Sequence, residues 1–157
     1  MDKLKIGIAG CGKISHFHRV FIDSYPNATL CAVADKDEHA LREMSEQYGI
    51  RNCYTNIEEM IEQESTDVVH IATPPQTHAA LAAASIERNN HVFVEKPVTT
   101  DHATAVKLYD MALRNNVRIC VDHNHLFDPW MLEAKDVLRD SYSDISYVES
   151  YCGINPD

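Results

Sequence analysis

The stretch KIGIAGCGKIS, residues 5–15, joins an apolar run to a pair of glycines and then to a helix-like sequence. A second apolar run, within LCAVADKD at residues 30–37, stops at the acidic residue Asp35. Glycines at such a turn let the chain bend sharply and let main-chain amides approach a bound anion. This order of strand, glycines, helix, strand and carboxylate predicts a site for a dinucleotide.

The sequence on either side of this stretch alternates apolar runs with amphipathic segments. Most of the runs are unbroken Val, Ile, Ala and Cys, which is typical of parallel strands covered on both faces. We expect strands at Leu4–Ala9, Thr29–Ala34, Asn52–Tyr54, Asp67–Ala72, His91–Glu95 and Arg118–Asp122. We expect helices at Lys13–Asp23, Asp37–Tyr48, Ile57–Gln63, Gln76–Arg88 and Asp101–Arg114. The pattern predicts an α/β fold, a doubly wound Rossmann-type parallel sheet with right-handed crossovers.

The last thirty residues follow a different pattern. Asp128 and Pro129 are suited to the N-cap and first position of a further helix, and residues 145–152 alternate as a half-buried strand does. We therefore expect a dinucleotide-binding domain at 1–127, and a crossover helix with the first strand of a truncated C-terminal domain at 128–157. We expect residues 145–157 to be displaced, poorly ordered or paired with another copy in a homo-oligomer, because that strand has no partner.

Charge and cysteine content exclude several classes of function. The 157 residues include 24 acidic and 14 basic side chains, a net charge of -10, which disfavours nucleic acid and anionic membranes as partners. The five cysteines are scattered without a Cys-x-x-Cys pair, so we interpret them as buried thiols in a reducing compartment. The sequence opens on an expected strand, with no signal-like segment and no run of membrane-spanning length. These features predict a cytoplasmic protein.

The glycine motif has a specific interpretation. Gly10 would allow the tight turn and Gly12 the approach to a pyrophosphate, while Ser15 replaces the usual small third residue. Asp35 follows Gly12 by 23 residues, close to the usual spacing of a ribose-binding carboxylate. A carboxylate there repels a 2'-phosphate and favours NAD over NADP, although the adjacent Lys36 opposes this preference. The alternative is a turn with a purely structural role.

Two further motifs follow expected strands. The fourth strand is followed by Thr73, Pro74 and Pro75, with His78 shortly beyond them. The fifth strand is followed by Glu95, Lys96 and Pro97. Ligands of open α/β sheets bind at these carboxyl ends. From about Leu4 to Pro129, the sequence resembles the N-terminal domain of the glucose-fructose oxidoreductase and myo-inositol dehydrogenase family. The Glu-Lys-Pro motif is the most diagnostic part of the resemblance.

The resemblance implies roles for individual residues. The pyrophosphate would be lined by Gly10, Gly12, Lys13 and Ile14, and the adenosine ribose would bind to Asp35. The cofactor would be bordered by Thr73, Pro74 and His78, and its nicotinamide ribose would contact Glu95. Lys96 would be the catalytic residue, since a cation beside the reacting hydroxyl stabilises developing alkoxide charge. The alternative is that Glu95 and Lys96 form a solvated ion pair at a strand end.

The loop after the sixth strand departs from the family pattern. Asn124, Phe127 and Pro129 fit, but Leu126 stands where many members have Arg, which leaves the substrate contacts of this loop undefined. Paired histidines, His16 with His18 and His123 with His125, lack a completing ligand set. We therefore expect no metal.

The resemblance implies hydride transfer between NAD and a sugar, sugar derivative or cyclitol. Family members continue into a mostly β domain whose His, four residues after an Asp, commonly supplies acid-base catalysis. We expect the 157 residues alone to be inactive. Three hypotheses follow: the cofactor-binding portion of a sugar or cyclitol dehydrogenase, which we favour, a short non-catalytic NAD-binding protein, or an adenine-nucleotide-sensing Rossmann module.

Overall fold

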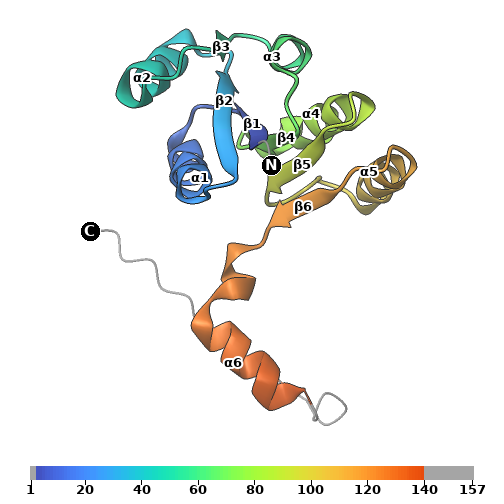
Figure 1. Cartoon of the computed structure of the whole chain (residues 1–157). Coiled ribbons are helices and arrows are strands. Elements are labelled where there is room, and N and C mark those ends of the chain that lie inside the picture. The colour runs from blue at the N-terminus through green and yellow to red at the C-terminus, as the bar shows by residue number, and fades with distance from the viewer. Residues whose placement is uncertain (1–2, 140–157) are drawn as a thin grey trace. The chain divides into compact units, whose positions relative to one another are not determined.

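The computed structural model describes residues 3–139 and contains one parallel sheet of six strands (Figure 1). The strand order is β3-β2-β1-β4-β5-β6, so β1 is central and the chain leaves it toward opposite halves of the sheet. The strands are β1 (Leu4–Ala9), β2 (Ala28–Ala34), β3 (Cys53–Tyr54), β4 (Val68–Ile71), β5 (His91–Glu95) and β6 (Ile119–Asp122). The predicted α/β fold is confirmed.

Helices cover the sheet on both faces. They are α1 (Lys13–Ser24), α2 (Glu38–Tyr48), α3 (Ile57–Glu64), α4 (Pro75–Glu87) and α5 (His102–Arg114). Side-chain caps explain where three of them begin: Asp37 accepts main-chain N–H bonds at the start of α2, Asn56 at α3 and Asp101 at α5. Gly49, in the left-handed conformation, ends α2. The observed boundaries of these helices and of the strands differ from the expected ones by at most one residue.

Two apolar clusters form the core, one on each face of the sheet. Ile8, Val33 and Met44 belong to the cluster beneath α1 and α2. The larger cluster joins the opposite face to α3, α4 and α5, and includes Ile71 and Val94, both fully buried.

The half of the sheet that contains β4, β5 and β6 is covered unevenly. Val69 and Ile71 of β4 are fully buried, whereas Val68 and His70, which alternate with them, are only partly buried. The face of the sheet that carries Val68 and His70 has a groove of about 330 Å³, which is lined by residues such as His70, Phe93 and Cys120.

The prediction that the cysteines are buried is confirmed for Cys11, holds only in part for Cys31 and Cys53, which are partly buried, and is wrong for Cys120, which is exposed in this groove. Cys152 lies outside the described residues.

The contacts divide the chain between Asp122 and His123. The second unit contains a short 3₁₀ helix, η1 (Asn124–Phe127), and helix α6 (Pro129–Leu138). Asp128 and Pro129 occupy the predicted N-cap and first position of α6. The strand expected at 145–152 lies outside the described residues. Within residues 3–139, no helix combines the length and hydropathy needed to cross a membrane.

Gly10 is the position where the fold requires glycine. Its φ is +98°, and a Cβ built there would lie 2.7 Å from the Ala72 carbonyl oxygen. The loops that leave β1 and β4 approach each other too closely for any side chain. By contrast, a Cβ on Gly49 meets nothing within 4 Å, although its φ is also positive.

We expect Gly10→Ala to lower the free energy of unfolding by about 2–4 kcal/mol, since it combines backbone strain with a main-chain clash. Gly49→Ala is the matched control and should cost about 1–2 kcal/mol, because only the backbone conformation is unfavourable. Urea unfolding of the two variants measures both. Equal losses would contradict the tight approach of the two loops.

Candidate functional site

The glycine-rich turn and Asp35 form one hydrogen-bonded unit at the carboxyl ends of β1 and β2. The Asp35 Oδ2 accepts the Cys11 N–H at 2.6 Å, and Oδ1 accepts the Asp37 N–H at 2.9 Å. The main-chain N–H of Gly10 also donates to the Ala34 carbonyl at 2.8 Å. The structure therefore brings together the two features that the sequence predicted as a dinucleotide site.

The start of α1 is open for an anion. Gly12 is the N-cap, has no capping side chain, and a Cβ built on it would meet nothing within 4 Å. Its φ of -76° does not require glycine, so the fold itself does not explain this residue. Lys13 and Ile14 follow it and are exposed. The arrangement offers free main-chain N–H groups and the positive end of the helix dipole to a phosphate.

The glycine-rich turn contains two buried residues, Cys11 and Ser15. Ser15 is fully buried and donates to the Gly12 carbonyl at 2.5 Å, so it meets the need for a small third residue. Cys11 is also buried, and burial, with the charge of Asp35, raises the pKa of its thiol to about 12. A thiol with that pKa stays protonated and unreactive at neutral pH.

His78 links the two motifs that follow β4 and β5. Its ring is fully buried, with Nε2 2.7 Å from the Thr73 carbonyl oxygen and Nδ1 2.8 Å from that of Pro97. Pro74 is the exposed N-cap of α4, and the Lys96–Pro97 peptide bond is cis. His78 thus supports both loops from behind through their main chain.

Glu95 and Lys96 do not pair with each other. Glu95 Oε1 lies 3.1 Å from the Nε2 of His18, and Lys96 is exposed, with no hydrogen bond or ion pair to any residue in the described range 3–139. This geometry disfavours the ion-pair alternative. It leaves the Lys96 ammonium group available at the edge of the sheet.

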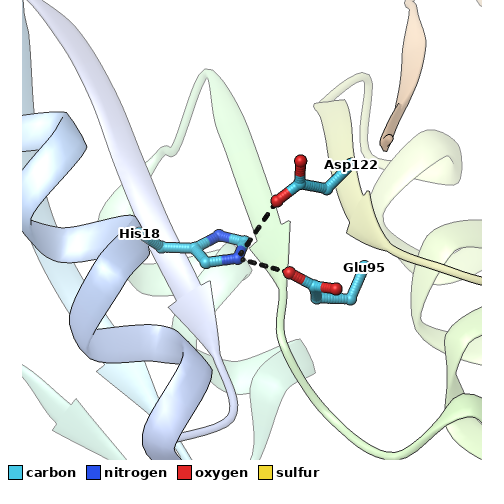
Figure 2. A group of neighbouring side chains, drawn as sticks. All are labelled: His18, Glu95 and Asp122. Carbon is cyan, nitrogen blue, oxygen red and sulfur yellow. Dashed lines mark hydrogen bonds and ion pairs between the residues drawn. The ribbon is translucent and has the colours of Figure 1, made fainter. Parts of the chain in front are cut away.

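The sequence analysis missed a cluster around His18. Figure 2 shows the His18 ring, which projects from α1, with its Nε2 directed at two carboxylates, Glu95 at 3.1 Å and Asp122 at 4.0 Å. Behind it, Nδ1 of His18 lies 3.1 Å from Nδ1 of His70, and the ring of Phe93 packs against both histidines. A signal was available, because Glu95 and Asp122 end neighbouring strands and pair in register.

The burial of His70 determines its charge state. Burial, with a smaller contribution from His18, lowers its pKa from 6.5 to about 3. His70 is therefore neutral at physiological pH and has a single ring N–H to donate.

The three ligand atoms of His18, Glu95 and Asp122 lie within 4.8 Å of one another, a set that could hold a metal ion. The 3.1 Å contact between His18 and Glu95 is a hydrogen-bond distance, and a proton between the two atoms accounts for it. His16, the other histidine of the predicted pair, instead contacts the Tyr48 hydroxyl at 2.7 Å.

Residues 4–123 match the family model GFO_IDH_MocA, an oxidoreductase family with an NAD-binding Rossmann fold. The chain belongs to this family, and its first unit is the NAD-binding Rossmann domain.

Three relatives illustrate the family. Myo-inositol 2-dehydrogenase of Thermotoga maritima is 29% identical over 136 residues, which cover 87% of this chain and 41% of the relative. The structure of Lactobacillus casei scyllo-inositol dehydrogenase with NAD(H) and scyllo-inositol matches with a TM-score of 0.81 and 22% identity, covering 88% of this chain and 41% of that one. The structure of WlbA dehydrogenase of Bordetella pertussis, with NADH and UDP-GlcNAcA, matches with a TM-score of 0.84 and 24% identity. The match covers 87% of this chain and 42% of that one. The chain thus spans about two fifths of each.

We expect the neutral state of His70 to make the protein sensitive to acid. A folded pKa below the unfolded value contributes stability that is present above pH 6.5 and is lost as the pH falls toward 3. Between pH 7 and pH 4.5 the His70 contribution to the free energy of unfolding should fall by about 2–3 kcal/mol.

Urea unfolding of the wild type and of His70→Asn at the two pH values isolates this contribution. Asn keeps a polar atom near the Nδ1 position but does not titrate, so the variant should lose less stability on acidification than the wild type does. Identical pH dependence in both proteins would show that His70 can be protonated in the folded state.

Proposed function

We propose that the chain binds NAD(H) and forms the cofactor-binding part of a dehydrogenase that acts on a sugar, sugar derivative or cyclitol. The observation that carries the proposal is the unit formed by the glycine turn and Asp35, at the point of the sheet where the connections diverge on either side of β1. Family membership and the substrates of the inositol and sugar-nucleotide relatives support the same conclusion.

In this proposal the pyrophosphate binds over Gly12 and the first turn of α1, beside Gly10, Lys13 and Ile14. The open space at Gly12 supports this role, because a side chain there would occupy the position of the phosphates. The remaining lone pairs of Asp35 accept the hydroxyls of the adenosine ribose. A 2'-phosphate would be repelled by the same carboxylate, so we propose NAD rather than NADP.

The nicotinamide end lies toward the loops after β4 and β5. Thr73 and Pro74 border the cofactor, and His78 contributes by fixing the main chain of these loops. Glu95 lies toward the nicotinamide ribose. Lys96, exposed and without a partner among residues 3–139, is the residue proposed to contact the substrate hydroxyl. A bound NAD would supply the hydride acceptor, and the ammonium group of Lys96 would stabilise the negative charge that develops on the substrate oxygen.

A second candidate function is a module that binds NAD or an adenine nucleotide without catalysis. The described range contains Lys96 and the cofactor edge, but the chain spans only about two fifths of its relatives. We propose that residues 1–127 form the cofactor-binding domain, that residues 128–157 begin a substrate domain, and that the 157 residues alone do not turn over substrate. Assay of this chain beside a full-length version, each with NAD and a panel of inositols and sugars, distinguishes the two functions: we expect turnover from the full-length version alone, and no turnover from either would favour the non-catalytic function.

We expect Asp35→Ala to weaken NAD about 10- to 100-fold, because it removes hydrogen bonds to a charged acceptor. NADP affinity should change by less than about threefold, since loss of the ribose contact is offset by relief of repulsion. Titration calorimetry with both cofactors measures the change.

Asp37→Ala is the control, because it removes a charge two residues away whose carboxylate is used to cap α2. This variant should leave the ratio of the NAD and NADP affinities unchanged. An equal loss of both cofactors in Asp35→Ala would remove Asp35 from the ribose role.

We expect Gly12→Ala to weaken NAD at least tenfold while it changes the free energy of unfolding by less than about 1 kcal/mol. The added methyl group projects into space that is empty of protein and that the pyrophosphate would occupy. Calorimetry and urea unfolding on the same sample separate the two effects. Unchanged NAD affinity would place the pyrophosphate elsewhere.

A further inference from the structure

The His18 side chain is held on both sides. It is 4% exposed, on the buried face of α1 that also carries Ser15 and Ile22. Its two ring nitrogens contact different partners, His70 through Nδ1 and Glu95 through Nε2, each at 3.1 Å. The ring also packs edge-on against Phe93 at a centroid distance of 5.6 Å. The orientation of the imidazole is therefore fixed by contacts in three directions.

Glu95 needs such a contact to hold its position. It pairs in register with Asp122, so two carboxylates end neighbouring strands on the same face of the sheet. Like charges at this separation repel, and the Glu95 side chain is only 13% exposed, which limits screening by water. A hydrogen bond from the Nε2–H of His18 stabilises the Glu95 carboxylate beside Asp122 (Figure 2).

His70 makes this donation directional. His70 is neutral, so it can donate its one ring N–H from Nδ1 to the Nδ1 of His18 without bringing a positive charge into the cluster. Because the Nδ1 of His18 is then the acceptor, the ring proton of His18 lies on Nε2 and is directed toward Glu95. Asp122 lies farther away, at 4.0 Å, so the shorter contact selects Glu95 as the acceptor.

We propose that His18 is a positioning residue for the nicotinamide end of the cofactor site. Held by His70 and Phe93, it fixes the Glu95 carboxylate at the end of β5, and thereby the turn that carries Lys96. This inference rests on the proposed function, and it assigns to α1 a second role: its first turn faces the pyrophosphate, and its second turn controls the opposite end of the cofactor.

The test compares NAD with ADP, which has the same adenosine and pyrophosphate groups but neither the nicotinamide nor the ribose that carries it. In His18→Asn, the shorter side chain can still reach His70 but not Glu95. We expect this variant to bind NAD about tenfold more weakly, and ADP within about twofold of the wild type. Titration calorimetry measures both ligands.

Rescue separates positioning from a general structural role. Gln places its amide nitrogen near the Nε2 position of histidine, so His18→Gln should keep NAD affinity within about threefold of the wild type. His16→Asn, on the same helix with a contact to Tyr48, is the matched control and should leave both affinities unchanged.

The outcomes are distinct. An equal loss of affinity for ADP and NAD in His18→Asn, or no loss for either, would overturn the inference, and so would a His18→Gln variant that binds NAD as weakly as His18→Asn does. A rise in the thermal midpoint of the wild type with Zn²⁺ that is absent in His18→Asn would also overturn it, because the cluster would then hold a cation. Failure of the wild type to bind either ligand would instead refute the proposed function.

Discussion

The close approach of Gly10 to the Ala72 carbonyl is the constraint on which the site depends. It occurs at the centre of the sheet, where β1 lies between β2 and β4 and the connections run to opposite halves. The neighbouring contacts extend from there: Asp35 joins the turn to β2, and His78 joins the loops after β4 and β5. His18 then joins α1 to β5. Hydrogen bonds of these side chains therefore connect neighbouring segments along the carboxyl edge of the sheet.

Local patterns predicted the fold and one part of the site. The strand bounds follow from continuous apolar runs, and the link between Gly10 and Asp35 follows from a motif whose spacing is set by one strand–helix–strand unit. The cluster of His18, Glu95 and Asp122 depends instead on the register of β5 with β6 and on the rotation of α1, which sequence spacing alone does not determine. Cys120 was misjudged for a related reason, since an apolar run does not show which face of its strand is covered.

The site also explains how an acidic chain can bind an anionic cofactor. The net charge of -10 disfavours phosphate groups at long range, but the field at the glycine turn is local. Main-chain N–H groups at the start of α1 carry about half a unit of positive charge, and Lys13 lies beside them. We therefore propose that specificity for a dinucleotide comes from oriented dipoles within a few ångströms, while the negative charge of the chain opposes other polyanions.

Asp35 is already fixed before any ligand arrives, since both of its oxygens accept main-chain hydrogen bonds. The conformational entropy of this side chain is therefore lost during folding and not during association. If the adenosine ribose binds here, as we propose, it meets a preorganised acceptor and gains most of the enthalpy of its hydrogen bonds with little opposing entropy from the protein. In this proposal the recognition of the adenosine half is coupled to the stability of the sheet edge, so substitutions that loosen the edge should reduce affinity without contacting the cofactor.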